Sequence, residues 1–165
     1  MYRRSTRSAE LSALPPPVVA AIDRHAGQHQ LRLDAVRAWV THSENPPSES
    51  FFGKLFGARA NSADPDAWHD TYVLLHPTHL VVATAGEKRP TSVLSLPLAL
   101  ASMVRGSGLA LAADIPGAND GVTVTGFPGE HGQTGSCFVG LGPDAAGREC
   151  AAALEAAITA AKNPR

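Results

Sequence analysis

The stretch from Tyr72 to Gly86 constrains the fold of this chain more than any other part of the sequence. Two runs rich in Val and Leu flank the residues His-Pro-Thr-His, and Pro77-Thr78 suits the two central positions of a type I turn. The stretch therefore predicts an antiparallel hairpin. A two-residue turn also sets the register, which pairs Leu75 with Leu80, Val73 with Val82, Leu74 with Val81 and Tyr72 with Ala83.

This register makes both faces of the predicted hairpin apolar. Leu75 and Val73 share one face with their partners, whereas Leu74 and Tyr72 share the other face with theirs. An antiparallel barrel buries only one face of each strand. A further element has to cover the outer face, and the N-terminal helix is the natural candidate.

Short apolar runs separated by turn residues surround the hairpin. Besides its two strands, we expect strands over residues 35–42, 91–96, 109–113, 121–127 and 135–141. Residues 30–42 leave an alternative open, because Leu33, Val36 and Val40 also fit a helical stripe. Seven strands at this spacing are typical of an antiparallel sandwich or barrel.

The sequence also predicts one helix near each end of the chain. Residues 16–26 begin with prolines, which suit a first helical turn, and carry Val18 and Ile22 on one face. A second amphipathic helix is expected near the C-terminus, with Gly142 at its N-cap. The apolar stripe of this second helix consists of Cys150, Leu154, Ala157, Ile158 and Ala161.

These elements predict a single globular domain of mainly β (α+β) class. We expect a small seven-stranded antiparallel barrel or sandwich, capped by the C-terminal α-helix and extended by the N-terminal helix. Residues 1–11 are expected to form a disordered tail, residues 12–30 the helical extension, and residues 31–165 the barrel with its capping helix.

The order of these elements resembles that of the pleckstrin-homology-like superfold, in which seven antiparallel strands precede one amphipathic helix. The passage Leu96-Pro97-Leu98, Ser102-Met103-Val104 and Gly108-Leu109-Ala110-Leu111 resembles the "I-P-L…I-S-S-V…G-L" passage of bacterial members. Residues 136–142 are similar to their last strand where it enters the capping helix. The chain therefore resembles bacterial pleckstrin-homology-like (PH-like) domain proteins over about residues 31–162.

The resemblance implies a non-enzymatic barrel that binds a phosphoinositide, a peptide or another copy of itself. In lipid-binding members, basic residues in the loop after the first strand hold the phosphates in a Lys–spacer–Lys/Arg-x-Arg arrangement. Here residues 43–68 offer only Lys54 and Arg59, without a basic-x-basic pair. We therefore expect a binding or scaffold module that acts through protein–protein contact or self-association.

Composition and charge exclude several classes of partner. The formal net charge of −1 gives no electrostatic case for a nucleic acid. No run reaches the roughly 18 apolar residues of a membrane span, and the basic N-terminus lacks the apolar stretch of a secretory signal. Cys137 and Cys150 form neither a disulfide framework nor a zinc set, so we expect two buried thiols in a reducing cytoplasm.

The sequence predicts neither a catalytic residue nor a metal site nor a cofactor. His76 and His79 face each other across the hairpin turn, but no third ligand lies near them in the predicted hairpin. His25 and His29 have metal-like spacing, yet the glycine between them is expected to end the helix. Residues 142–147 have the glycine spacing of a phosphate loop without its Lys-Ser/Thr. An enzyme or a small-ligand binder is therefore the least favoured function.

The longest predicted connection, residues 43–68, contains the candidate binding surface. Its aromatic residues either pack against the barrel or form an exposed aromatic-basic patch. An exposed patch would bind a partner protein, or would attach the domain to a membrane surface, which is the alternative function. The candidate residues are Phe51, Phe52, Lys54, Phe56 and Arg59.

Overall fold

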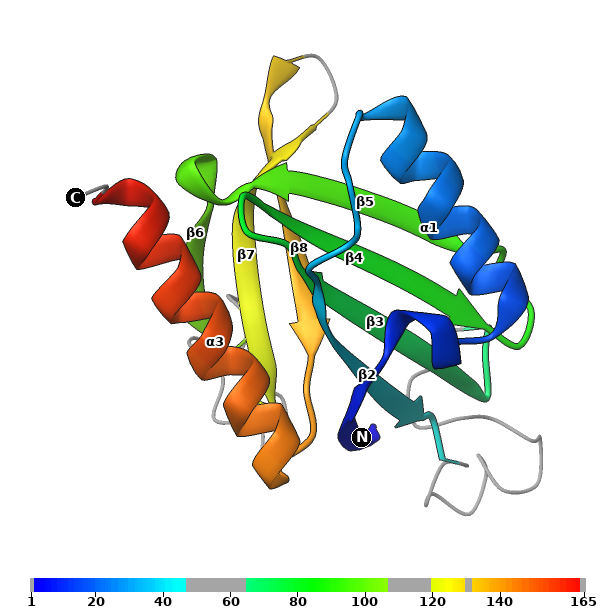
Figure 1. The fold of residues 1–165 in the computed structure, drawn as a ribbon. Helices are drawn as coiled ribbons and strands as arrows, with labels where there is room; N and C mark the ends of the chain where they lie inside the picture. The colour runs from blue at the N-terminus through cyan, green and yellow to red at the C-terminus, as the bar shows by residue number, and fades with distance from the viewer. Residues whose placement is uncertain (1, 47–64, 107–119, 130–131, 164–165) are drawn as a thin grey trace.

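The structure is a computed structural model and describes residues 2–46, 65–106, 120–129 and 132–163 (Figure 1). These residues form two antiparallel sheets. The first sheet has the order β1-β2-β3-β4-β5, and its strands are β1 (Arg3–Ala9), β2 (Arg37–Glu44), β3 (Trp68–Leu75), β4 (His79–Gly86) and β5 (Ser92–Pro97). The second sheet has the order β6-β7-β8, and its strands are β6 (Ser102–Arg105), β7 (Gly121–Pro128) and β8 (Thr134–Gly140).

Two α-helices accompany the sheets, α1 (Pro16–Gln28) and α3 (Ala145–Lys162). Short 3-10 turns precede α1 at Leu11–Ala13 and follow β5 at Leu98–Leu100. The prediction of a mainly β fold that ends in a helix is therefore confirmed. Neither α-helix is long and apolar enough to span a membrane in the part of the chain that the structure describes.

The hairpin of β3 and β4 has the predicted register. Leu75 pairs with Leu80, and the other three predicted pairs are also formed. The backbone N–H of His76 donates to the carbonyl oxygen of His79 at 2.9 Å, which closes the turn around Pro77-Thr78. Local sequence was sufficient here because the turn and both apolar runs are contiguous in the chain.

Helix α1 covers the outer face of the first sheet, as predicted for the exposed side of the hairpin (Figure 1). Val18 and Ile22 of α1 are buried against Tyr72 and Leu74 of β3 and Val81 of β4. The inner face packs against the second sheet and α3 in a separate core. That core includes Trp39, Val73, Leu80, Leu96, Val122, Val124, Val139 and Leu154.

The C-terminal helix begins later than predicted. Asp144, not Gly142, is the N-cap residue, and its Oδ1 accepts a hydrogen bond from the backbone N–H of Gly147 at 2.8 Å. A carboxylate at the N-cap accepts a hydrogen bond from an otherwise unpaired N–H of the first helical turn, whereas glycine has no side chain to do so. The predicted apolar stripe is otherwise confirmed, because Cys150, Leu154 and Ile158 are buried.

The prediction of a disordered tail over residues 1–11 is wrong for most of that segment. Arg3–Ala9 form the edge strand β1. This strand pairs antiparallel with seven of the eight residues of β2, from Glu44 to Ala38. The strand carries mostly exposed polar side chains, with Thr6 as its buried residue. A polar edge strand has almost no apolar alternation, so hydrophobic periodicity could not detect it.

The architecture also differs from a closed seven-stranded barrel. The described residues contain eight strands in two separate sheets, and β1 and β6 were not predicted as strands. Residues 37–44 are a strand, which settles the strand-or-helix ambiguity of residues 30–42. The predicted strand over residues 109–113 lies outside the described residues.

Candidate functional site

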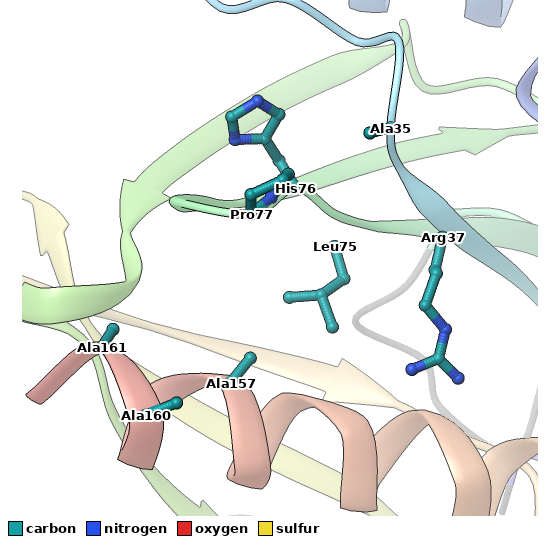
Figure 2. A pocket seen from close by; sticks show the side chains of 8 residues that line it. All are labelled: Ala35, Arg37, Leu75, His76, Pro77, Ala157, Ala160 and Ala161. Carbon is teal, nitrogen blue, oxygen red and sulfur yellow. The ribbon is translucent and has the colours of Figure 1, made fainter. Parts of the chain in front are cut away.

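A groove lies between α3 and the end of the first sheet, with a cavity volume of about 430 Å³ (Figure 2). Leu75 at the end of β3 points toward the helix, and Ala157 and Ala161 of α3 point toward the sheet. Six of the eight lining residues are apolar, and Arg37 and His76 are the other two. The lining residues are Ala35, Arg37, Leu75, His76, Pro77, Ala157, Ala160 and Ala161.

The groove exists because α3 presents small side chains next to its buried stripe. Leu154 and Ile158 anchor the helix in the core, while Ala157 and Ala161 are partly buried and Ala160 is exposed. Methyl groups leave space between helix and sheet where larger side chains would fill it. The predicted stripe included Ala157 and Ala161, but Ala160 was missed because the stripe was traced only along the buried face.

Arg37 of β2 forms one side of the groove and is held in place by two contacts. Its guanidinium Nη2 donates to Oε1 of Glu149 on α3 at 2.7 Å, and the guanidinium carbon lies 4.7 Å from the ring centre of Trp39. Both members of the ion pair are more than half exposed, so the pair contributes little to stability. Its effect is to orient a cationic group beside the apolar lining.

The turn between β3 and β4 forms another wall, through His76 and Pro77 (Figure 2). The backbone N–H of Thr78 donates to Nδ1 of His76 at 3.1 Å, so this nitrogen is an acceptor. The hydroxyl of Thr78 lies 3.0 Å from the same nitrogen and 2.8 Å from Nδ1 of His79. The turn is thus held by hydrogen bonds that involve both of its histidines.

Each of the two histidine pairs singled out in the sequence brings its rings close together. Helix α1 continues through Gly27 to Gln28, contrary to the expectation that this glycine ends it, and the rings of His25 and His29 lie 4.2 Å apart. The rings of His76 and His79 lie 6.0 Å apart, and burial lowers the pKa of His79, with smaller contributions from His76 and His29. No group of three or more His, Cys, Asp or Glu side chains among the described residues has the geometry to hold a metal ion.

A second cavity, of about 410 Å³, lies on the outer face beside the part of the sheet that α1 leaves uncovered. Nδ1 of His42 and Oδ1 of Asp70 are 2.7 Å apart there, and the hydroxyl of Tyr72 donates to the other Asp70 oxygen at 3.3 Å. Burial, with a smaller contribution from Asp70, raises the pKa of Tyr72 to about 12. Sequence analysis missed this group, because His42 lies on β2 opposite Asp70 of β3, and no local spacing connects the two.

The His42–Asp70 pair does not extend to a nucleophile. Ser5 is the cross-strand partner of His42 on β1, but the second ring nitrogen of His42 lies 3.9 Å from Oε1 of Glu44. The ring also lies 5.9 Å from the ring of Trp68, on the side away from β1. A serine–histidine–aspartate arrangement needs a hydrogen bond between the histidine ring and the hydroxyl. Among the described residues, the two ring nitrogens of His42 face Asp70 and Glu44 instead.

The candidate binding residues from the sequence, Phe51, Phe52, Lys54, Phe56 and Arg59, lie outside the described residues. Cys137 and Cys150 are both free thiols. Burial raises the pKa of the Cys137 thiol and, with a further contribution from Glu149, raises that of Cys150 to about 12. Neither thiol is therefore activated as a nucleophile.

Comparison of the chain with protein-family models, with curated proteins and with solved structures gives no match. The fold and the arrangement of the side chains are accordingly the basis for any functional assignment.

Proposed function

We propose that this protein is a non-catalytic binding module that holds a segment of a partner protein in the groove beside α3. The observation that supports this best is the composition of the groove, in which six apolar residues are accompanied by Arg37 and His76. Binding sites commonly combine a mostly apolar lining with a few polar groups that orient the ligand. The PH-like fold that the sequence resemblance implies, and the cytoplasmic location expected from the two cysteines, would both be consistent with such a module.

The shape of the groove favours a peptide segment as the ligand. It runs between a helix and the end of a sheet, and the alanines of α3 allow the backbone of a partner segment to approach closely (Figure 2). Arg37 can donate to a carbonyl or carboxylate group of that segment, since an arginine has five N–H donors and Glu149 uses only part of them. Affinity would come from the apolar contacts and orientation from Arg37.

The test uses two lysine substitutions on exposed positions of α3. Ala160→Lys fills the groove, whereas Ala152→Lys, two turns away, lines no described cavity and is the matched control. Peptides are selected by phage display against the wild-type protein, and their affinities are measured by calorimetry. We expect Ala160→Lys to weaken binding by at least about tenfold, or about 1.4 kcal/mol, and Ala152→Lys to leave it unchanged.

Peptides that bind the Ala160→Lys variant as tightly as the wild type would contradict the proposal. Sedimentation velocity over a range of concentrations shows whether a second copy of the chain occupies the groove. In that case the wild type and the Ala152→Lys variant would dimerise, and the Ala160→Lys variant would remain monomeric.

A further inference from the structure

The side chains that line the groove beside α3 offer hydrogen-bond donors to a ligand. Arg37 has N–H groups only, and Nδ1 of His76 accepts from the backbone N–H of Thr78, so His76 carries its hydrogen on Nε2. The other lining residues in the described part of the chain have apolar side chains. The polar group of a ligand in this groove therefore has to be an acceptor, and a carboxylate makes the strongest hydrogen bonds to a guanidinium.

The two ends of the groove differ in charge. Figure 2 shows Arg37 at one end and Ala160 and Ala161 at the other. These two alanines belong to the last turn of α3, which ends at Lys162, and the carbonyl groups at the C-terminal end of a helix carry a partial negative charge. An anionic group of a ligand is therefore favoured beside Arg37 and disfavoured beside the two alanines.

Glu149 already binds Arg37, but this ion pair can be exchanged for another. Nη2 of Arg37 donates to Oε1 of Glu149 at 2.7 Å, and the two side chains are 56% and 53% exposed. Such a pair is only weakly stabilising, because water solvates both groups well when they separate. The guanidinium also lies 4.7 Å from the ring centre of Trp39, which is buried, and this contact does not involve Glu149. Trp39 therefore holds Arg37 beside the groove when Glu149 turns away.

We propose that Arg37 binds an acidic side chain of the partner segment, which takes the place of Glu149. The incoming carboxylate can accept two parallel N–H bonds, whereas Glu149 accepts from Nη2 alone. A side chain reaches the half-exposed guanidinium while the backbone of the segment continues along the alanines, which a C-terminal carboxylate does not allow. The segment therefore has an Asp or Glu flanked by apolar residues. This inference rests on the proposed function, which supplies the segment, and adds the charge that the groove selects.

Three short peptide probes test this inference. N-acetyl-Leu-Glu-Leu-amide carries the acidic side chain, its Gln counterpart is neutral, and the same Gln peptide with a free C-terminus carries only a terminal carboxylate. NMR follows binding through the side-chain Nε–H resonance of Arg37 and the backbone amide of Ala160. We expect the Glu probe to bind at least about fivefold more tightly than either Gln probe. This difference should shrink at about 0.5 M salt, because Arg37 is partly exposed.

Two substitutions with opposite effects distinguish binding from a structural role. Arg37→Gln should remove the preference for the Glu probe, whereas Glu149→Gln should strengthen its binding about two- to fivefold, because the competing carboxylate is gone. The control is a matched ion pair. Arg105 of β6 donates to Glu155 of α3 at 2.9 Å, with 61% and 58% of the side chains exposed, and neither residue lines the groove. We expect Arg105→Gln and Glu155→Gln to leave the affinities of all three probes unchanged.

Several results would overturn the inference. These are equal affinities of the Glu probe and the amidated Gln probe, the absence of any shift of the Arg37 resonance at millimolar probe concentrations, and a preference for the Glu probe that persists in Arg37→Gln. The Gln probe with the free C-terminus should not bind as tightly as the Glu probe. If it does, Arg37 binds the end of a segment and not an acidic side chain.

Two outcomes separate this inference from the proposed function. If the selected peptides lose affinity for Ala160→Lys but the Glu and Gln probes do not differ, the proposed function stands and the inference fails. If the Glu probe depends on Arg37 but binds Ala160→Lys as tightly as the wild type, Arg37 binds a carboxylate outside the groove. The proposed function is then wrong, and the preference of Arg37 for an acidic side chain stands.

Discussion

Asp144 joins the two ends of the chain, and its replacement tests the part of the fold that the sequence did not predict. One carboxylate oxygen caps α3 by accepting from the N–H of Gly147, and the other accepts from the backbone N–H of Thr6 on β1 at 2.6 Å. The hydroxyl of Thr6 accepts in turn from the backbone N–H of Gly142 at 2.7 Å. One side chain therefore both starts the last helix and holds the first strand.

The expected cost of Asp144→Ala is the sum of two losses. Loss of the N-cap costs about 0.5–2 kcal/mol. The N–H of Thr6, a buried residue, is left without its acceptor, at a cost of about 1–3 kcal/mol. Because water can partly replace the carboxylate at the edge of β1, we expect a total of about 1.5–4 kcal/mol, and a melting temperature lower by about 3–16 °C.

Asp144→Ser separates the two losses. A serine hydroxyl can still cap α3, but it is too short to reach the backbone of β1 at the same time. We expect this variant to be about 1 kcal/mol more stable than Asp144→Ala, as measured by urea unfolding. Both variants should show faster hydrogen exchange at β1 than at β3. A loss of less than about 0.5 kcal/mol for Asp144→Ala, typical of a surface substitution, would refute the reasoning.

Three further predictions concern two glycines and the membrane alternative. Gly27→Ala should stabilise the protein by about 0.5–1 kcal/mol, because a methyl group there meets open space on an exposed turn of α1. Gly147→Ala should instead destabilise the protein by about 1–3 kcal/mol, because its methyl group would overlap the carbonyl oxygen of Gly142. Urea unfolding measures both changes in the free energy of unfolding. Changes of the same sign in the two variants would contradict this reasoning. We also expect the protein not to co-sediment with anionic vesicles at about 0.15 M salt. Membrane attachment would be favoured instead if the protein bound these vesicles tightly, and if the double variant Lys54→Ala with Arg59→Ala bound them at least about tenfold more weakly at low salt.

The parts of the fold that the sequence predicted are those whose signals are local. The β3–β4 hairpin is specified by one turn and two adjacent apolar runs, so that its register could be derived residue by residue. The need for an outer cover followed from the same residues, because Leu74 and Val81 had to be buried somewhere. α3 was predicted from its apolar period, although its N-cap was placed two residues early.

Strand β1 was not predicted, because the contacts that hold it are not local in the sequence. Its residues pair with residues of β2 that lie far along the chain, as Thr6 does with Thr41, 35 positions away, and no feature of residues 3–9 indicates that partner. Its anchor is Asp144, 138 positions away from Thr6 in the sequence. A strand that is held by long-range polar contacts has no signature in a local pattern of hydrophobic residues.

The candidate sites follow the same rule. His76–His79 was judged a weak metal pair because no third ligand lies near it, and His25–His29 because Gly27 was expected to end the helix. Instead, α1 continues through Gly27 and docks on the outer face through Val18 and Ile22 rather than through any histidine. Burial lowers the pKa of His25, so the protonation of this side chain depends on the apolar packing that holds α1 in place.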